Sequence, residues 1–194
     1  MSVIKGELER RTSGEIRLDP SGDRKLRGYA IVFNKKSLDL GGFREIILPE
    51  AVDRTLREAL DVRALFDHDS GKILGRTRAG TLRLWADGHG LAVDINPPNP
   101  TDPPNLLTSM ERGDITGMSF SFRTLTDDWR MEDGEVIREV SDMRVHEVSI
   151  VSFPAYPDTD VQVAQRALQG FMATQKGKHS KVWWERWHRT QLAR

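Results

Sequence analysis

The feature that most constrains this chain is a repeated alternation of apolar and polar residues with a period of two. In the stretch TGMSFSF, a strand would place the apolar Met118, Phe120 and Phe122 on one face. The same strand would place Ser119 and Ser121 on the other face. Further strand-like stretches, separated by turn signals, are RGYAIVFN, DVRALFDHD, KILGRTRAGTLRLWADGHGLAVDIN and VHEVSIVS. The sequence therefore predicts a mainly β fold.

Helical periodicity is limited to a few stretches. It is strongest in PEAVDRTLREAL (residues 49–60), where Val52, Leu56 and Leu60 recur every four residues. Shorter helical patterns occur in NLLTSMERGD and VQVAQRALQG. The charged stretch DDWRMEDGE is predicted to be the hairpin region between the last two strands. Together these patterns indicate an α+β protein, in which helices pack against a predominant β-structure.

Changes in composition divide the chain into three parts. Residues 1–25 are polar and rich in turn signals, which indicates an N-terminal lead-in with at most one strand, at GEIRL. Residues 26–162 contain the strand patterns and are predicted to form one domain. Residues 163–194 begin as a helix and end in a basic tail with three of the five tryptophans. Such a tail is typical of a contact surface, or of a helix that docks on the domain through its tryptophans.

Charge and composition exclude several classes of function. Lys and Arg total 29, as do Asp and Glu, so no overall field favours nucleic acid or a membrane surface. Since no apolar run approaches the roughly 20 residues of a membrane helix and no signal peptide is evident, a cytoplasmic protein is expected. The absence of cysteine excludes disulfides and thiolate chemistry. Because metal-ligand spacings and phosphate-binding loops are also missing, no metal or other cofactor is expected.

Three side-chain types in the strand patterns could support nucleophilic chemistry. His68 stands at the end of a predicted strand in FDHDS, where a surface histidine is the simpler interpretation. Strict alternation in MRVHEVSIV places His146 and Glu147 on opposite faces, so only one of them would point into a given site. A serine, a histidine and a carboxylate on separate strands are the parts of a hydrolase triad, but many chains could supply such a set.

Five blocks in a fixed order resemble a known family. They are RGYAIVFN…GGFREIILPEAV, LFDHDSGKILGRT, LRLWADGHGLAVDI, MERGDITGMSFSF and VHEVSIVSFPAYPDT. Over roughly residues 26–160 the chain resembles the prohead proteases, the capsid maturation proteases of tailed bacteriophages and prophages. The resemblance implies a serine endopeptidase with a herpesvirus assemblin-like fold, a β-barrel surrounded by helices.

Carried over residue by residue, the resemblance implies a catalytic set. Ser119 would be the nucleophile, His68 the general base and Glu147 the third member. The family usually has glycine where this chain has Ser121, so a second hydroxyl is an alternative nucleophile. The herpesvirus relatives use a second histidine as the third member, which makes His146 the alternative to Glu147.

The resemblance also implies a role and partners. The protein would cleave scaffolding protein or the scaffolding segment of the major capsid protein, and itself, inside the immature capsid in the host bacterial cytoplasm. Neither a membrane nor a nucleic acid is expected as a partner, whereas a homo-oligomer is consistent with the related viral enzymes. The basic tail would bind scaffold or capsid protein. One alternative is a catalytically inactive capsid-assembly or scaffold-binding protein with the same fold, and another is an unrelated β-barrel binding module.

Overall fold

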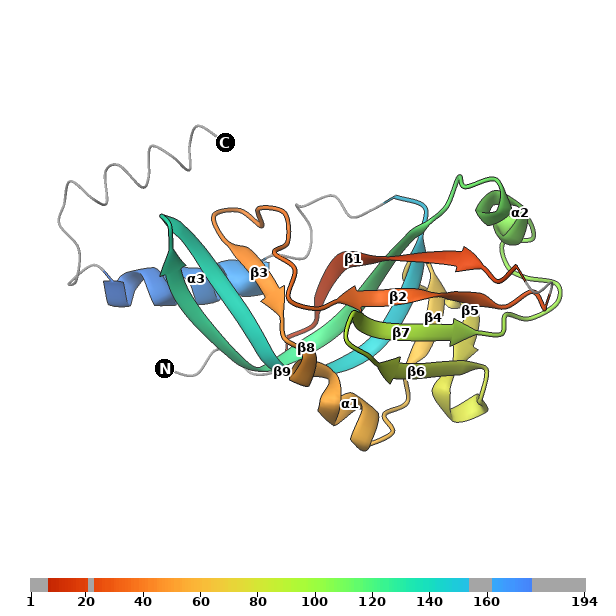
Figure 1. The fold of residues 1–194 in the computed structure, drawn as a ribbon, viewed down its shortest axis with the longest axis horizontal. Helices are drawn as coiled ribbons and strands as arrows, with labels where there is room; N and C mark the ends of the chain where they lie inside the picture. Colours follow the sequence, from red (N-terminus) through yellow and green to blue (C-terminus); the bar gives the residue numbers. More distant parts are fainter. Residues whose placement is uncertain (1–6, 21–22, 154–161, 176–194) are drawn as a thin grey trace.

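The computed structural model describes residues 7–20, 23–153 and 162–175 (Figure 1). The strands are β1 (Glu9–Leu18), β2 (Leu26–Val32), β3 (Arg44–Ile47), β4 (Arg63–Phe66), β5 (Asp69–Arg76), β6 (Leu82–Ala86), β7 (Gly90–Ile95), β8 (Gly117–Glu132) and β9 (Glu135–Val151). The helical segments are η1 (Pro49–Val52), α1 (Asp53–Arg57), η2 (Thr77–Ala79), α2 (Leu106–Glu111) and α3 (Gln162–Gln175). The predicted mainly β fold with packed helices is confirmed.

All nine strands join one sheet, in the order β5-β4-β9-β8-β1-β2-β7-β6, with β3 beside β9. β3 and β4 run parallel to β9, whereas the other pairs are antiparallel. The two ends of the order meet at Thr81, whose N–H donates to the Arg76 carbonyl over 3.2 Å and whose carbonyl accepts from Asn96 N–H over 2.9 Å. Glycine is required at Gly75, because a Cβ there would lie 2.7 Å from the Thr81 carbonyl oxygen. The sheet therefore curls into a nearly closed barrel.

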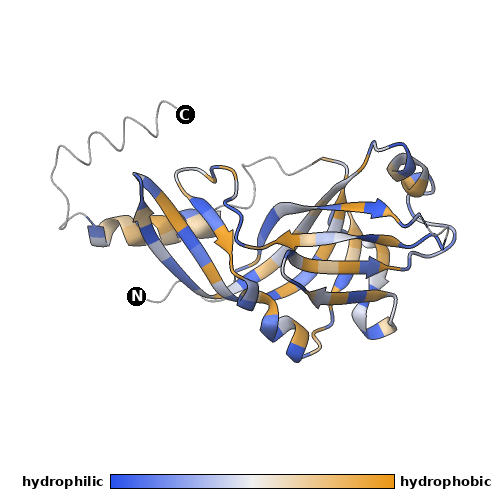
Figure 2. Ribbon diagram, viewed as in Figure 1, coloured by the Kyte–Doolittle hydropathy of each residue, from blue (hydrophilic) through white to orange (hydrophobic). Residues whose placement is uncertain are grey.

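The apolar faces of the strands fill the barrel, and Figure 2 shows apolar and polar residues alternating along them. Met118, Phe120 and Phe122 are fully buried in this core, as the alternation in TGMSFSF predicts. The rings of Phe120 and Phe122 pack with centroids 5.1 Å apart. Burial of each such side chain contributes about 1.5–3 kcal/mol. β8 is thus fixed through the face opposite to its two serines.

The helix predicted for residues 49–60 is shorter than expected. It begins as the 3-10 turn η1 and continues as α1, which ends at Arg57. Ala59 adopts a left-handed φ of +45°, which ends the helical path. α1 contacts β9 through Thr55, whose hydroxyl donates to the Met143 carbonyl over 3.3 Å and accepts from Val145 N–H over 3.0 Å. No helix in the described parts of the chain is long and apolar enough to cross a membrane.

β1 lies within the sheet, between β2 and β8, although residues 1–25 were predicted to be a lead-in with at most one strand, at GEIRL. Its inward face is charged and buried. Arg138 of β9 donates to Glu9 over 2.6 Å, and Arg11 donates to Glu45 of β3 over 2.9 Å. Buried charges are tolerated when they are paired in this way. A charged inward face shows no apolar alternation, which is why the sequence does not reveal the first half of β1.

β8 and β9 extend beyond the barrel as a long hairpin. The predicted hairpin region is mostly strand, because the turn consists only of Asp133 and Gly134, with φ of +51° and +82°. α3 packs against this extension (Figure 1), within an apolar cluster of Phe43, Val136, Ala164, Leu168 and Met172. The rings of Trp129 and Phe171 also stack, with centroids 6.1 Å apart. The basic tail lies outside the described residues.

Candidate active site

The polar face of β8 is the centre of the candidate site. Ser119 lies opposite Ser149 of β9, and Ser121 lies opposite Glu147. On the other side of β8, Thr12 and Arg10 of β1 are the partners of Ser119 and Ser121. The four β8 and β9 side chains lie on the face that points away from the barrel core, because their neighbours Phe120, Val148 and Ile150 are buried in it.

A β-bulge in β9 decides which residues share this face. The pairing passes from Ser121–Glu147 to Phe122–Val145, so His146 is an extra residue without its own partner on β8. As a result, Val145 and Val148 both lie in the core. The prediction that His146 and Glu147 point to opposite faces is therefore wrong: both lie on the side away from the core. Strict alternation failed because the inserted residue interrupts the period of two.

His68 reaches this face from a tight turn. Asp67 and His68 connect β4 to β5 and both have left-handed backbones, with φ of +48° and +58°. The turn is tied to the end of β9, because Asp67 N–H donates to the Ile150 carbonyl over 2.9 Å. Ser152 in turn donates its N–H and its hydroxyl to the Asp67 carboxylate, each over 2.8 Å. These contacts hold in place the turn that carries the imidazole.

Glu147 is the residue that His68 contacts. Nδ1 of His68 lies 2.6 Å from Oε1 of Glu147, and the hydroxyl of Ser121 donates to the same oxygen. The hydroxyl of Ser149 donates to Oε2 over 2.5 Å. Burial raises the pKa of the Glu147 carboxyl, but the hydrogen bonds from His68, Ser121 and Ser149 outweigh burial and bring the pKa below its ordinary value. The carboxylate is therefore ionised at neutral pH.

Ser119 is close to this group in the sheet but is bonded elsewhere. Its hydroxyl donates to the carbonyl of Arg11 in β1 over 2.9 Å, and its side chain is only 1% exposed. Among the described residues it makes no hydrogen bond to His68. The register nevertheless places Ser119, rather than Ser121, nearer the end of the sheet where His68 lies, since Phe66 pairs with Ile150 and Ile150 with Met118.

Ser121 and His146 were the alternatives to Ser119 and Glu147. The Ser121 hydroxyl binds Glu147 and also accepts from Nε of Arg10 over 3.3 Å. His146 makes no hydrogen bond within the described part of the chain to His68, which pairs with Glu147 instead. Burial, together with the charges of Arg123 and Arg144, lowers the pKa of His146. Ser149 lies two residues after Glu147 in β9, so strand alternation alone indicates that the two side chains share a face. No sequence signal pointed to the contact between Asp67 and Ser152.

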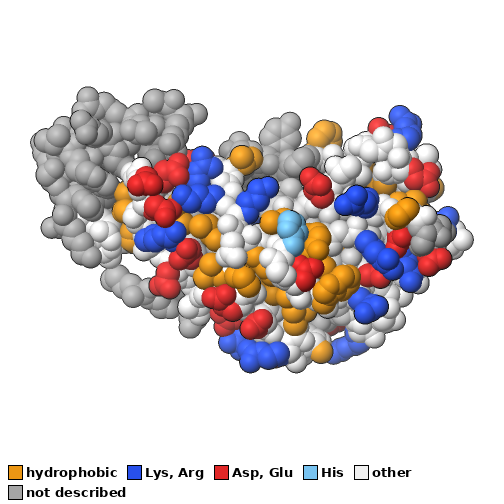
Figure 3. Space-filling view, in the orientation of Figure 1, with side chains coloured by type: hydrophobic (Ala, Val, Ile, Leu, Met, Phe, Trp, Pro, Cys, Tyr) orange, Lys and Arg blue, Asp and Glu red, His pale blue; other side chains and the backbone are white. Residues whose placement is uncertain are grey.

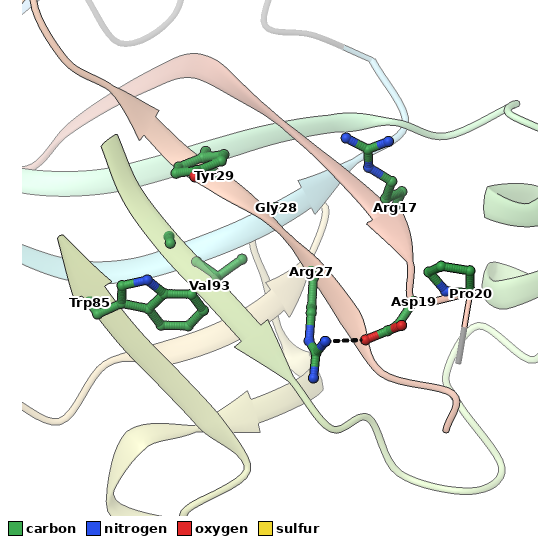
Figure 4. A pocket seen from close by; sticks show the side chains of 9 residues that line it. Arg17, Asp19, Pro20, Arg27, Gly28, Tyr29, Trp85 and Val93 are labelled. Carbon is green, nitrogen blue, oxygen red and sulfur yellow. Dashed lines mark ion pairs between the residues drawn. The ribbon is translucent and has the colours of Figure 1, made fainter. Parts of the chain in front are cut away.

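A hollow of about 420 Å³ lies over β1, β2, β6 and β7, and its lining residues do not include those of the candidate active site (Figure 4). Tyr29 and Trp85 form part of its wall, and Arg27 is paired with Asp19 over 2.5 Å. The described residues that line it include neither serine nor histidine.

Acidic and basic side chains are mixed over the face shown in Figure 3. In the described parts of the chain, no group of three or more His, Asp or Glu side chains is arranged to hold a metal ion.

Comparisons with known proteins show to which family the chain belongs. A family model for the caudovirus prohead serine protease matches residues 11–173. The prohead protease of Enterobacteria phage HK97 is 28% identical over 157 residues, which cover 77% of this chain and 65% of that relative. The chain thus spans slightly less than two thirds of that relative's length. The bacteriophage T4 capsid assembly protease has a TM-score of 0.49 and 11% identity, with 75% of this chain and 97% of that chain covered. Because the family model matches most of its length, the chain belongs to the caudovirus prohead serine protease family.

Proposed function

We propose that this protein is a serine endopeptidase of prohead maturation, with Ser119 as nucleophile, His68 as general base and Glu147 as the group that orients His68. The observation that carries this proposal is the 2.6 Å contact of His68 with Glu147, on the face of the sheet that holds Ser119. Three residue types required for acyl transfer are thereby gathered from β8, β9 and the turn between β4 and β5.

The contact with Glu147 also determines which ring nitrogen would act as the base. An ionised carboxylate can only accept hydrogen bonds, so Nδ1 carries a proton and its N–H donates a hydrogen bond to Glu147. In the neutral imidazole, Nε2 then has the free lone pair. The Ser119 hydroxyl would leave the Arg11 carbonyl and turn toward Nε2, a rotation about a single side-chain bond.

The reaction would follow the two steps of covalent acyl transfer. As Ser119 Oγ forms a bond to the peptide carbonyl carbon, its proton moves to Nε2 of His68. The C–N bond then breaks, and Nε2 returns the proton to the leaving amine. Water attacks the resulting ester with His68 again as the base, which releases the new carboxyl end and restores Ser119. In both steps the negative charge of Glu147 stabilises the imidazolium.

The proposed substrates are scaffolding protein or the scaffolding segment of the major capsid protein, together with the protease itself. The proposed location is the interior of the immature capsid, in the host bacterial cytoplasm. Support comes from the family to which the chain belongs. The basic tail, which lies outside the described residues, is proposed to bind scaffold or capsid protein, and a homo-oligomer is proposed from the same family.

A second candidate function is a catalytically inactive capsid-assembly or scaffold-binding protein with this fold. The observation that favours it is the state of Ser119, which is 1% exposed and bonded to a backbone carbonyl. In such a protein the polar side chains of β8 and β9 would only form hydrogen bonds with one another and would take no part in catalysis. Replacement of Ser119 by alanine would then leave head assembly unchanged.

Co-expression with the major capsid protein and scaffolding protein of the same phage, followed by intact-mass analysis, separates the two functions. We expect the wild type to produce shortened capsid or scaffold chains and Ser119→Ala to leave them intact. Ser141→Ala is the matched control, because Ser141 lies in the same sheet and, among the described residues, its hydroxyl donates only to the Thr126 carbonyl, over 3.5 Å. Uncut products with the wild type, or equal cutting by Ser119→Ala, would contradict the proposed catalytic set.

A further inference from the structure

Two hydroxyls that the proposed mechanism does not use are bonded to the carboxylate of Glu147. The Ser121 hydroxyl donates to Oε1, and the Ser149 hydroxyl donates to Oε2 over 2.5 Å. Ser121 is 1% exposed and Ser149 is 0% exposed, so water cannot readily replace either donor. Both oxygens of the carboxylate are therefore held from inside the protein, from two different strands.

We propose that Ser121 and Ser149 are positioning residues, which hold Glu147 in the conformation that reaches Nδ1 of His68, and that Ser121 is not the nucleophile. This inference rests on the proposed function, because it assigns a role within the same site.

The bulge explains why Glu147 needs such support. Glu147 follows directly after the extra residue His146, at the point where β9 loses its regular alternation. The pleat of the strand alone does not set the direction of the side chain there. Ser149, two residues further along β9, fixes Oε2, while Ser121 fixes Oε1 from the neighbouring strand. The two donors together constrain the rotation of the carboxylate.

The bonds of Ser121 also argue against its being the nucleophile. Its proton points to a carboxylate oxygen rather than to an imidazole nitrogen, and its oxygen accepts from Arg10 Nε over 3.3 Å. An attacking serine must give its proton to the base as the new bond forms. The same carboxylate oxygen also accepts from Nδ1 of His68. The register adds that Ser119 lies nearer than Ser121 to the turn that carries His68.

The electrostatics agree with this arrangement. Hydrogen bonds to an ionised acceptor are about twice as strong as those between neutral groups. The hydroxyl donors oppose the effect of burial and help to lower the pKa of Glu147. Loss of either donor should therefore raise this pKa and weaken the hold on His68.

The test compares the wild-type full chain with Ser121→Ala, Ser121→Gly and Ser149→Ala. For each alanine variant we expect kcat to fall by about ten- to hundredfold with KM unchanged, the range that corresponds to one lost hydrogen bond to a charged group. The titration midpoint of the Glu147 carboxyl carbon, followed by NMR, should rise in each variant. A fluorophosphonate should label Ser119 in the wild type and in Ser121→Gly. Ser141→Ala is the matched control and should change none of these quantities, and thermal melting checks that each variant is folded.

Several results would overturn the inference. One is a fluorophosphonate adduct on Ser121, and another is complete loss of labelling in Ser121→Gly when the chain is folded. An unchanged Glu147 midpoint and unchanged kcat in both alanine variants would contradict the positioning role. If the wild type neither reacts with the fluorophosphonate nor cleaves its substrate, the proposed function fails. The change in the titration midpoint of the Glu147 carboxyl carbon in the two alanine variants still decides whether the two hydroxyls hold the carboxylate.

Discussion

Nδ1 of His68 and Oε1 of Glu147 lie 2.6 Å apart, although 79 positions separate the two residues in the sequence. The parallel pairing of β4 with β9 brings the two segments together, and the turn at Asp67 and His68 directs the imidazole onto the polar face of β9. This contact between an imidazole and a carboxylate is the geometric basis of the proposed catalytic set.

Glu147→Gln should reduce kcat strongly while the chain stays folded. The amide cannot stabilise an imidazolium as a carboxylate does, and the loss of the corresponding acidic group in a serine protease triad lowers kcat by about 10⁴-fold. Peptide cleavage by the full chain measures the effect, with Glu15→Gln on the exposed part of β1 as control. Cleavage at the wild-type rate in Glu147→Gln would remove Glu147 from the mechanism.

The stability of the protein should depend on pH through Glu147. Because its pKa in the folded state lies below the ordinary value of 4.5, Glu147 contributes stability above that value. This contribution is lost as the pH falls through the lowered pKa. The free energy of unfolding in urea, measured from about pH 7 to about pH 3, should therefore fall more steeply for the wild type than for Glu147→Gln. Parallel curves for the two proteins would contradict the lowered pKa.

Asp67→Asn should lower kcat without a comparable change in KM. Asparagine tolerates the left-handed backbone at this position, but the neutral amide binds the Ser152 N–H and hydroxyl less strongly than the carboxylate. The His68 turn would then be held less firmly. Asp69→Asn, on the other side of the turn, is the matched control, because its carboxylate accepts from Gly71 N–H instead. Equal kcat values for both variants would show that the contact with Ser152 does not position His68.

A truncation after Gly170 should lower the stability of the protein below that of a truncation after Gln175. The shorter chain loses the stacking of Phe171 on Trp129 and the buried side chain of Met172. A loss of about 2 kcal/mol corresponds to a fall in melting temperature of about 5 °C for a chain of this size. Calorimetry of both truncated chains measures the difference, and identical melting temperatures would contradict the docking of α3.

Arg138→Met should be strongly destabilising. Arg138 is fully buried and donates to Glu9, Glu45 and Asp127, so its loss leaves carboxylates buried without their main partner. Breaking a buried ion pair from one side costs about 3–5 kcal/mol. Arg130→Met on the same hairpin is the control, since Arg130 is 40% exposed and its pairing with Glu139 contributes about 1 kcal/mol or less. Urea unfolding of the two variants should show the contrast.

The sequence by itself determined which face of β8 is buried, because the alternation of Met118, Phe120 and Phe122 with two serines leaves only one way to fill the barrel. Through its resemblance to a family, it also led to the proposal that His68, Ser119 and Glu147 form the catalytic set. Most strands followed from their own local patterns, which is what short-range periodicity can reveal.

Only the tertiary structure decided the features that depend on pairing between distant segments. The bulge at His146 places both His146 and Glu147 on the outer face, and it exists because β8 has one residue fewer than β9 between the paired positions. The first half of β1 joins the sheet because Arg138 of β9 and Glu45 of β3 neutralise the charges of its inward face, and a hydroxyl of β8 donates to Glu9. Local periodicity contains no information about partners on distant segments. The tertiary structure is therefore needed to show that the hydroxyls of Ser121 and Ser149 bind Glu147, and that β1 pairs with β8 beside Ser119.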